Sequence, residues 1–301
     1  MIQNNDSFHT VIEIDALLEN LHEGSWAIFD CRYELTDPEY GERVYMEGHV
    51  PGAQYINLEH DLSARPDGRN GRHPLPSPDN LARLFSSRGI DRGTQVVAYD
   101  ARGGGFAARL WWSLRFLGHF DVAVLNGGYP EWLRKGCPVN KGRETRSAAR
   151  FLPEVQVEML VDHNDVERAS NSPKLQGATI EDSENAVRLI DSRAPERYAG
   201  LEEPYDPVAG HIPGAINRDW TLNLDPEDKF AGQTSLRSAF NSILDESRPA
   251  EAIVYCGSGV TACHNILGME YAGLTGARLY AGSWSEWCSD PDRPVAPSSG
   301  N

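Results

Sequence analysis

The sequence predicts an α/β fold that is built twice, as two tandem domains, each with a mostly parallel sheet flanked by helices. A chain of 301 residues is long enough for two domains of about 150 residues. Each half alternates short apolar runs with amphipathic segments, a pattern typical of parallel sheets. Four motifs also occur twice in the same order, about 160 residues apart, which indicates a tandem duplication. The pairs are FDCR (29–32) with IDSR (190–193), GHVPGA (48–53) with GHIPGA (210–215), VVAYD (96–100) with AIVYC (252–256), and NGGYPEW (126–132) with AGSWSEW (281–287).

The first half contains three predicted strands and a clearly delimited helix. The strands are the apolar runs 26–29, 95–99 and 122–125. The helix is predicted in the stretch SPDNLARLFSSRG, where Ser77 is a suitable N-cap and proline occupies the first turn. Gly89 is the expected end of this helix.

A strand, a glycine-rich turn and a helix form a unit that both halves share. After Asp100, apolar residues recur at helical spacing, namely Leu110, Leu114 and Leu117. After Cys256 the same spacing is kept by Val260, Cys263 and Leu267. The polar segment NKGRETRSAARFLP separates the two copies. We therefore expect one domain over 1–140, a linker over 141–155 and a second domain over 156–301.

The composition excludes several classes of partner. Acidic residues outnumber basic ones 44 to 28, and the formal net charge of -16 disfavours nucleic acid and anionic membranes. No apolar run approaches the ~20 residues of a membrane-spanning helix, and the polar N-terminus lacks a secretory signal pattern. Five cysteines do not form a disulfide framework, and no CxxC pair suggests zinc. We expect a cytoplasmic protein with reduced thiols and no metal or organic cofactor.

Cys256 lies in the stretch VYCGSGVTAC, between an apolar run and a glycine-rich turn. The backbone N–H groups of such a turn, with the start of the following helix, form a pocket for negative charge. A thiol there has its anionic form stabilised, so its pKa falls below the value of about 8.5 for a free cysteine. This is the environment of a nucleophile. A small, buried and unreactive cysteine would fit the same position, and the turn alone does not decide between the two.

The first copy of the turn carries Asp100 where the second carries Cys256. If the cysteine served packing alone, the first copy should hold an apolar residue there. We expect the carboxylate to repel an anion from the first loop, which leaves one inactive and one active domain. The remaining thiols are expected to be structural: Cys31, Cys137, Cys263 and Cys288.

These motifs carry a family resemblance. CGSGVT after an apolar strand, preceded by DSR and GHIPGA and followed by GSWSEW, resembles the two-domain rhodanese sulfurtransferases over nearly the whole chain. The resemblance implies two rhodanese-like domains, a silent first and a catalytic second, which transfer sulfur through a cysteine persulfide. Thiosulfate enzymes of this family typically have cations in a CRKGVT-like loop. The uncharged loop here is similar to that of 3-mercaptopyruvate sulfurtransferases, which implies a small-molecule sulfur donor and a thiol or cyanide acceptor.

The resemblance also implies a set of catalytic residues. Cys256 would be the nucleophile, and the loop amides would hold the charge of the outer sulfur at Gly257, Gly259, Val260 and Thr261. Ser258 corresponds to a serine that works with an aspartate and a histidine, matched here by Asp61 and His73. Such a relay would supply the proton that the pyruvate enolate needs. Asp61 as the cap of a local turn and His73 as a surface histidine are the alternatives. Because both precede the linker, we expect the site between the two halves.

Substrate binding is assigned by the same resemblance. Arg197 matches the arginine that binds the substrate carboxylate, which a guanidinium can contact through two parallel hydrogen bonds. An ion pair with Glu196 or Glu202 is the alternative. Mercaptopyruvate enzymes usually carry a second arginine several residues later, where this chain has Tyr205 and Asp206. The loss leaves the choice of donor open.

Motifs that occur in both halves are expected to be structural, because one half is expected to be inactive. This applies to the histidines His49 and His211 and to the tryptophans Trp132 and Trp287. Arg193 of the DSR motif is expected to stabilise its own domain through a carboxylate.

Three other functions share part of the pattern. A thiosulfate sulfurtransferase would use the same persulfide with a different donor. A phosphatase of this type needs an arginine six residues after the cysteine, where this chain has Ala262. A persulfide carrier would use Cys256 to deliver sulfur to a partner without turnover of a small molecule.

Overall fold

The computed structural model describes residues 7–171, 187–245 and 247–296, which form two compact units. The first unit comprises the chain up to Leu62, Pro76–Gln156 and Pro226–Phe230. The second comprises Ser63–Leu75, Val157–Asp225 and the chain from Ala231 onward. Segment 63–75, which precedes the linker in sequence, therefore belongs structurally to the second unit.

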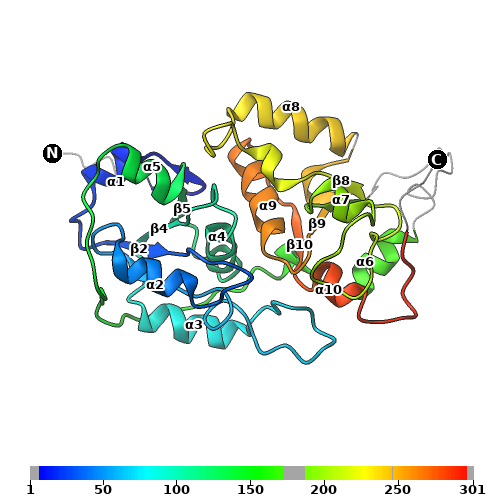
Figure 1. Ribbon diagram of the computed structural model, residues 1–301, viewed down its shortest axis with the longest axis horizontal. Helices are drawn as coiled ribbons and strands as arrows, with labels where there is room; N and C mark the ends of the chain where they lie inside the picture. The colour runs from blue at the N-terminus through cyan, green and yellow to red at the C-terminus, as the bar shows by residue number, and fades with distance from the viewer. Residues whose placement is uncertain (1–6, 172–186, 246, 297–301) are drawn as a thin grey trace. The chain divides into compact units, whose positions relative to one another are not determined.

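Each unit contains a five-stranded parallel sheet, and equivalent strands follow the same order in the two sheets. Figure 1 shows the helices and strands of both units. Side by side in the first sheet lie β1 (Val11–Ile12), β5 (Val122–Leu125), β4 (Gln95–Tyr99), β2 (Trp26–Asp30) and β3 (Gln54–Tyr55). In the second sheet the order is β6 (Leu160–Val161), β10 (Arg278–Tyr280), β9 (Ala252–Tyr255), β7 (Arg188–Asp191) and β8 (Ile216–Asn217). The predicted fold of two tandem α/β domains is confirmed.

Helices connect the parallel strands in both units. The first unit contains α1 (Ile14–Glu19), α2 (Tyr40–Glu47), α3 (Pro78–Ser87), α4 (Ala107–Phe116) and α5 (Gly128–Arg134). The second contains α6 (His163–Ser170), α7 (Pro195–Tyr198), α8 (Gln233–Leu244), α9 (Thr261–Tyr271) and α10 (Ser283–Trp287). Short 3₁₀ turns lie at Val157–Met159, Trp220–Asn223 and Pro249–Glu251. Among the described residues, no helix is long and apolar enough to cross a membrane.

The local sequence signals agree with these elements. The three predicted strands are β2, β4 and β5, and β2 extends one residue further, to Asp30. Helix α3 begins as predicted, because the Ser77 hydroxyl accepts a hydrogen bond from the Asn80 N–H at 3.3 Å. Gly89 follows α3 with a φ of +76°, a backbone conformation that favours glycine. Helix α4 is buried on every side rather than along one face.

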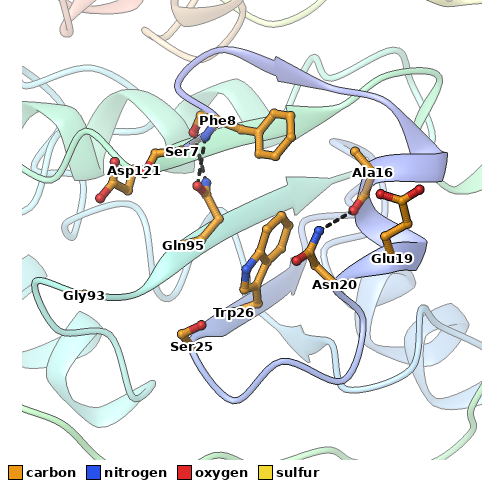
Figure 2. A pocket seen from close by; sticks show the side chains of 10 residues that line it. All are labelled: Ser7, Phe8, Ala16, Glu19, Asn20, Ser25, Trp26, Gly93, Gln95 and Asp121. Atoms are coloured by element: carbon orange, nitrogen blue, oxygen red, sulfur yellow. Dashed lines mark hydrogen bonds between the residues drawn. The ribbon is translucent and has the colours of Figure 1, made fainter. Parts of the chain in front are cut away.

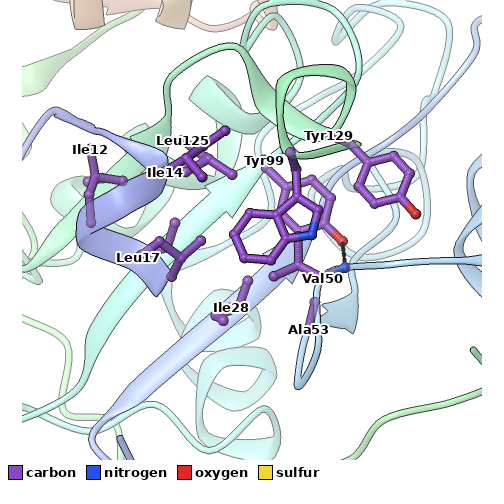
Figure 3. Packing of buried hydrophobic residues seen from close by; sticks show 12 residues of the cluster. Ile12, Ile14, Leu17, Ile28, Val50, Ala53, Tyr99, Leu125 and Tyr129 are labelled. Atoms are coloured by element: carbon purple, nitrogen blue, oxygen red, sulfur yellow. Dashed lines mark hydrogen bonds between the residues drawn. The ribbon is translucent and has the colours of Figure 1, made fainter. Parts of the chain in front are cut away.

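The core of the first unit lies on both faces of its sheet. Figure 3 shows one face, where Ile28 of β2 and Tyr99 of β4 pack with Leu17 of α1. Alternate strand residues point to the opposite face, and these are also buried: Ala27, Phe29, Val96, Ala98, Val122 and Val124. Helix α4 contacts β4 and β5. Helix α9 holds the equivalent place in the second unit, against β9 and β10.

The DSR-type motifs make the same contacts in both units. Arg32 pairs with the buried Asp30 at 2.5 Å and donates to the Gly48 carbonyl at 2.6 Å. Arg193 pairs with the buried Asp191 at 2.6 Å and donates to the Gly210 carbonyl at 2.7 Å. Burial lowers the pKa of Arg193, but the Asp191 carboxylate outweighs this effect and raises it overall. The predicted structural role of Arg193 is confirmed.

The repeated histidines and tryptophans are structural as well. His49 and His211 each stack on a tyrosine of the preceding helix, and Nδ1 donates to that tyrosine's carbonyl oxygen at 2.8 and 2.9 Å. Trp132 and Trp287 are fully buried, and the indole N–H of each donates to a proline carbonyl at 2.7 and 2.9 Å. These contacts recur in both halves, as the prediction requires.

The segment predicted as the linker has no helix or strand and packs along the first unit. The Arg146 guanidinium donates to the carbonyl oxygens of Gly24, Trp26 and Gly89. Further on, the N–H groups of Glu154 and Gln156 donate to carbonyls at the end of α4 at 2.9 and 2.8 Å. Backbone hydrogen bonds therefore fix this segment to the first unit up to residue 156.

Candidate active site

Cys256 is held at the carboxyl end of β9, directly before the turn that leads into α9. Its N–H donates to the Ser283 hydroxyl at 3.1 Å, and its carbonyl accepts the Trp284 N–H at 3.0 Å. Gly259 in the turn has a φ of +74°, and a Cβ there would lie 2.2 Å from the Ala281 carbonyl oxygen. No other residue type fits this position, so the glycine of the motif has a structural cause.

The hydrogen bonds around Cys256 favour its thiolate. The residue is 2% exposed, and burial by itself raises the pKa of its thiol. Hydrogen bonds from the Thr261 hydroxyl and from the N–H groups of Ser258, Ala262 and Val260 outweigh burial, so the pKa of Cys256 is lowered overall. Several of these donors belong to the start of α9, where the helix dipole also favours negative charge.

The other cysteines lie in different environments. Burial raises the pKa of Cys31 and Cys137, and it raises the pKa of Cys288 to about 11. Cys263 is fully buried on α9, and its Sγ lies 3.3 Å from the carbonyl oxygen of Gly259. A thiol with a raised pKa is a poor nucleophile at neutral pH. The surroundings of Cys256 are consistent with the prediction that its thiol is more reactive than those of Cys31, Cys137 and Cys288.

Ser258 and His73 are brought together within the second unit. Segment 63–75 belongs to this unit, and Nδ1 of His73 lies 2.7 Å from the Ser258 hydroxyl. Both side chains are buried, at 6% exposure each. His73 is therefore not the surface histidine that was the alternative prediction.

Asp61 lies in the first unit. Its carboxylate accepts the Asn57 N–H at 2.9 Å and pairs with Arg88 at 3.3 Å. The hydrogen bond from Asn57 belongs to a local turn, which is the alternative role predicted for Asp61. Its assignment to the relay stays a prediction that rests on the family resemblance.

Arg197 reaches the cysteine loop from α7. Its carboxylate partners are Glu203 at 2.7 Å and Asp206 at 3.3 Å, so the predicted alternative partners, Glu196 and Glu202, are wrong. The reason is the turn after α7, which brings the later carboxylates back beside the guanidinium while Glu202 stays exposed.

A second arginine, Arg72, lies beside the same loop and was not predicted. Its Nε donates to Asp206 at 2.9 Å. A Cβ built on Gly257 would lie 2.7 Å from Nη2 of Arg72 and 3.2 Å from Nη1 of Arg197. Two guanidinium groups therefore flank the residue that follows Cys256. The one signal in the sequence is that Arg72 directly precedes His73.

The first unit has a carboxylate in place of the thiol and uses it structurally. Asp100 is fully buried and accepts hydrogen bonds from four backbone N–H groups at 2.7 to 2.9 Å, those of Arg102, Gly104, Phe106 and Ala107. We expected the carboxylate to repel an anion from this loop. The carboxylate is itself the anion that the loop binds, which explains why the turn keeps its form without a thiol.

The first unit also contains a pocket, which lies away from the Asp100 loop. Figure 2 shows Trp26 and Gln95 in its wall, each the first residue of its strand, whereas Asp100 follows the carboxyl end of β4. Gln95 exchanges two hydrogen bonds of 2.9 Å with the backbone of Phe8. The residues that line the pocket include no cysteine: Ser7, Phe8, Ala16, Glu19, Asn20, Ser25, Trp26, Gly93, Gln95 and Asp121.

Comparison with known proteins agrees with this geometry. The family described as the rhodanese-like domain matches residues 13–135 and again 174–290. The chain belongs to this family. A Pseudomonas aeruginosa relative named "Probable 3-mercaptopyruvate sulfurtransferase" is 42% identical over 282 residues, which are 93% of this chain and 95% of that protein. A thiosulfate sulfurtransferase of Cricetulus griseus is 32% identical over 93% of this chain and 92% of its own length. The crystal structure of SseA from Escherichia coli, a 3-mercaptopyruvate sulfotransferase, matches with a TM-score of 0.76 and 28% identity over 92% of this chain and 99% of that one.

This rhodanese-like protein is therefore an enzyme, a sulfurtransferase with two tandem domains. The loop and the residues His73 and Ser258, which lie together in the structure, are predictable from the sequence. The hydroxyl of Thr261 and the amide of Ala262 are not, because the resemblance assigns only backbone amides and only as far as residue 261. Arg72 was not predicted either.

Proposed function

We propose that this chain transfers a sulfane sulfur from 3-mercaptopyruvate to a thiol or to cyanide through a persulfide on Cys256. The observation that carries the proposal is the buried Cys256 thiol under converging hydrogen-bond donors, in a loop whose own residues Gly257 and Ser258 are uncharged. An anion formed at this sulfur is stabilised by preorganised dipoles, which is the requirement for both the attacking thiolate and the persulfide.

The first half-reaction breaks a carbon–sulfur bond. The Cys256 thiolate attacks the sulfur of 3-mercaptopyruvate, an S–S bond forms, and the electron pair of the C–S bond passes to the substrate carbon. The product is the enolate of pyruvate. The proton of the substrate thiol moves to the enolate carbon, which becomes the methyl group of pyruvate, and the enzyme keeps a persulfide anion. Atoms and charge are then balanced.

Ser258 and His73 are proposed to carry that proton. Their 2.7 Å contact supports a relay in which the hydroxyl and the imidazole exchange a proton with the substrate. Asp61 is proposed as the third member on the family resemblance. In the second half-reaction, a thiolate or cyanide attacks the outer sulfur and releases the Cys256 thiolate.

Thiosulfate is the competing donor, because relatives with both names match this chain. The test is kcat/KM for each donor, measured with cyanide as the acceptor, for wild type and Cys256→Ser. We expect a higher value for 3-mercaptopyruvate and no activity with either donor in the variant. A higher value for thiosulfate would overturn the choice of donor. A single turnover per enzyme, without a steady state, would instead favour a persulfide carrier.

The cellular setting is also part of the proposal. All five cysteines are free thiols, and a persulfide enzyme needs its cysteine reduced, which favours the cytoplasm. The net charge of -16 supports small molecules rather than nucleic acid as partners.

A further inference from the structure

A second pocket of the first unit lies where the linker passes the end of α4. Its volume is about 340 Å³, at the lower end of the range of about 300–1,000 Å³ that small-molecule sites have. Residues 117–119, which follow α4, form one wall, and residues 150–154 of the linker form another. Arg92, in the loop before β4, lines the pocket as well. All of these residues belong to the first unit, whereas Cys256 belongs to the second.

Backbone contacts fix the linker on either side of this pocket. The Phe151 N–H donates to the Ser86 hydroxyl at 3.1 Å, and the Glu154 N–H donates to the Leu117 carbonyl at 2.9 Å. Gly118 has a φ of +81°, and a Cβ there would lie 2.7 Å from the Glu154 carbonyl oxygen. The close approach of the linker to the end of α4 therefore requires glycine. The pocket is lined by the residues between the two anchors, Leu152 and Pro153.

His119 brings a buried polar atom without a partner to this pocket. The residue is 7% exposed and lines the pocket, and its Nε2 is buried with no hydrogen-bond partner among the residues that the structure describes. Buried polar atoms nearly always have a partner in the protein, in a ligand or in ordered water. Burial lowers the pKa of His119 against the charge of Asp121 and backbone contacts with Thr94 and Asp121, so the ring is neutral at neutral pH. In one of its two neutral tautomers, Nε2 carries a hydrogen and is a donor.

Two arginines beside the pocket are free to bind a ligand. In the described part of the chain, the exposed guanidinium groups of Arg92 and Arg150 form no ion pair or hydrogen bond. The neighbouring Asp91 does not neutralise Arg92, because its carboxylate accepts the Gly93 N–H at 3.0 Å and the Thr94 hydroxyl at 2.9 Å. Acidic residues outnumber basic ones 44 to 28 in this chain, so a shortage of carboxylates does not explain the unpaired arginines.

The rest of the wall is mostly apolar and includes one carboxylate, that of Glu154. Two guanidinium groups and one carboxylate leave a single positive charge, since His119 is neutral. This balance suits a monoanion better than a dianion. Leu117 and Phe151 are buried, whereas Leu152 is 68% exposed, so the pocket offers apolar surface that solvent reaches. Few polar groups in an apolar wall are typical of small-molecule sites.

We propose that this pocket binds a small organic monocarboxylate with an apolar body. Arg92 and Arg150 bind the carboxylate, and Nε2 of His119 donates a hydrogen bond to it, because the bound anion favours the tautomer with its hydrogen on Nε2. The apolar body packs against Phe151 and Leu152. The site is formed by the first unit alone and does not depend on the proposed function of Cys256.

The probe is phenylacetate, which joins one carboxylate to a benzene ring. Its binding to the ¹⁵N-labelled full-length chain is followed through the backbone amide signals of Gly118 and His119. We expect saturable shifts with a Kd of about 1 mM or lower. Acetate lacks the ring and phenylacetamide lacks the charge, so each should bind at least about tenfold more weakly. Signals of Gly118 and His119 that do not move with phenylacetate overturn the proposal, and equal binding of phenylacetamide does so as well.

Variants test the arginines. Arg92→Ala and Arg150→Ala should each raise the Kd for phenylacetate by about threefold to tenfold, the range expected for charges that solvent screens. Arg83→Ala removes an exposed arginine of α3 that does not line the pocket, and it should match wild type. Arg92→Ala should also keep the wild-type kcat/KM for every sulfur donor. An unchanged Kd in the double variant Arg92→Ala with Arg150→Ala overturns the proposal, whatever donor the enzyme uses.

A matched pair of variants tests Nε2 of His119. His119→Gln keeps a nitrogen near the position of Nε2, whereas His119→Asn has a polar atom only near that of Nδ1. The Kd for phenylacetate should stay near wild type in His119→Gln and rise by about tenfold in His119→Asn. Comparison of the two variants separates the loss of Nε2 from the loss of the ring. Wild-type binding by His119→Asn would overturn the assignment of Nε2 as a ligand contact.

Discussion

The hydroxyl of Thr261 is predicted to control the reactivity of Cys256. Burial raises the pKa of the Cys256 thiol, and the hydrogen bond from the Thr261 side chain is the main contact that lowers it. The perturbation is Thr261→Val, which replaces the hydroxyl by a methyl group of similar size. The variant keeps the three backbone donors and loses one side-chain donor.

The size of the effect follows from this one contact. A hydrogen bond to a charged group contributes about 1.5–3 kcal/mol. Since about 1.36 kcal/mol corresponds to one pH unit, Thr261→Val should raise the pKa of Cys256 by roughly 1 to 2 pH units. A raised pKa leaves less thiolate at a given pH. The rate of alkylation at neutral pH should therefore fall by about tenfold to hundredfold.

The assay is the rate of Cys256 alkylation by iodoacetamide as a function of pH, followed on the Cys256 peptide by mass spectrometry. The midpoint of the wild-type profile should lie below that of an ordinary cysteine, because the pKa of Cys256 is lowered. The profile of Thr261→Val should move toward higher pH, and Thr261→Ser, which keeps the hydroxyl, should stay near wild type. A Thr261→Val profile that superimposes on the wild-type profile would show that the hydroxyl does not lower the pKa of Cys256.

Three further predictions concern the loops and the relay. Asp100→Ala should lower the free energy of unfolding by about 3–5 kcal/mol, because four backbone donors lose their acceptor. Asp100→Asn should be destabilised to a similar extent, since its NH₂ group would face N–H donors. Calorimetric unfolding of either variant at the wild-type temperature would contradict the role of Asp100 as the acceptor of its loop. Gly259→Ala should abolish persulfide formation on Cys256, because its Cβ would lie 2.2 Å from the Ala281 carbonyl oxygen; an active, normally folded variant would contradict the geometry of the turn. Ser258→Ala should lower kcat with 3-mercaptopyruvate by about 10²- to 10⁴-fold and leave loading of Cys256 by inorganic polysulfide unchanged. His73→Asn should do the same without adding to Ser258→Ala, and additive losses would argue against a shared relay.

Local patterns predicted the elements that carry the site. The run 95–99 and the run 122–125 are strands because apolar side chains fill both faces of a parallel sheet, and this is visible in the sequence. Ser77 caps its helix through a neighbour three residues away. The duplication then placed Cys256 and Asp100 at equivalent turns. Each of these predictions depends on contacts between residues that are close in sequence or on comparison of the two halves.

The parts that could not be predicted depend on distant contacts. Arg72 reaches Asp206 because segment 63–75 packs into the second unit, which no local pattern indicates. The partners predicted for Arg197 were wrong for a related reason, since a turn rather than the helix brings Glu203 to the guanidinium. The role of Asp100 was misjudged because charge alone suggests repulsion, whereas its orientation makes it the acceptor of its own loop.

Sulfur is proposed to be carried as a persulfide on Cys256, and the mass of the intact protein shows directly whether this persulfide forms. Wild type and Cys256→Ala are each incubated with 3-mercaptopyruvate, and separately with thiosulfate, and are then freed of excess donor. We expect that the wild type gains the mass of one sulfur atom from 3-mercaptopyruvate, that the gain disappears on addition of cyanide, and that Cys256→Ala gains nothing. A sulfur gain that persists in Cys256→Ala, or a wild type that gains none from either donor, would contradict it.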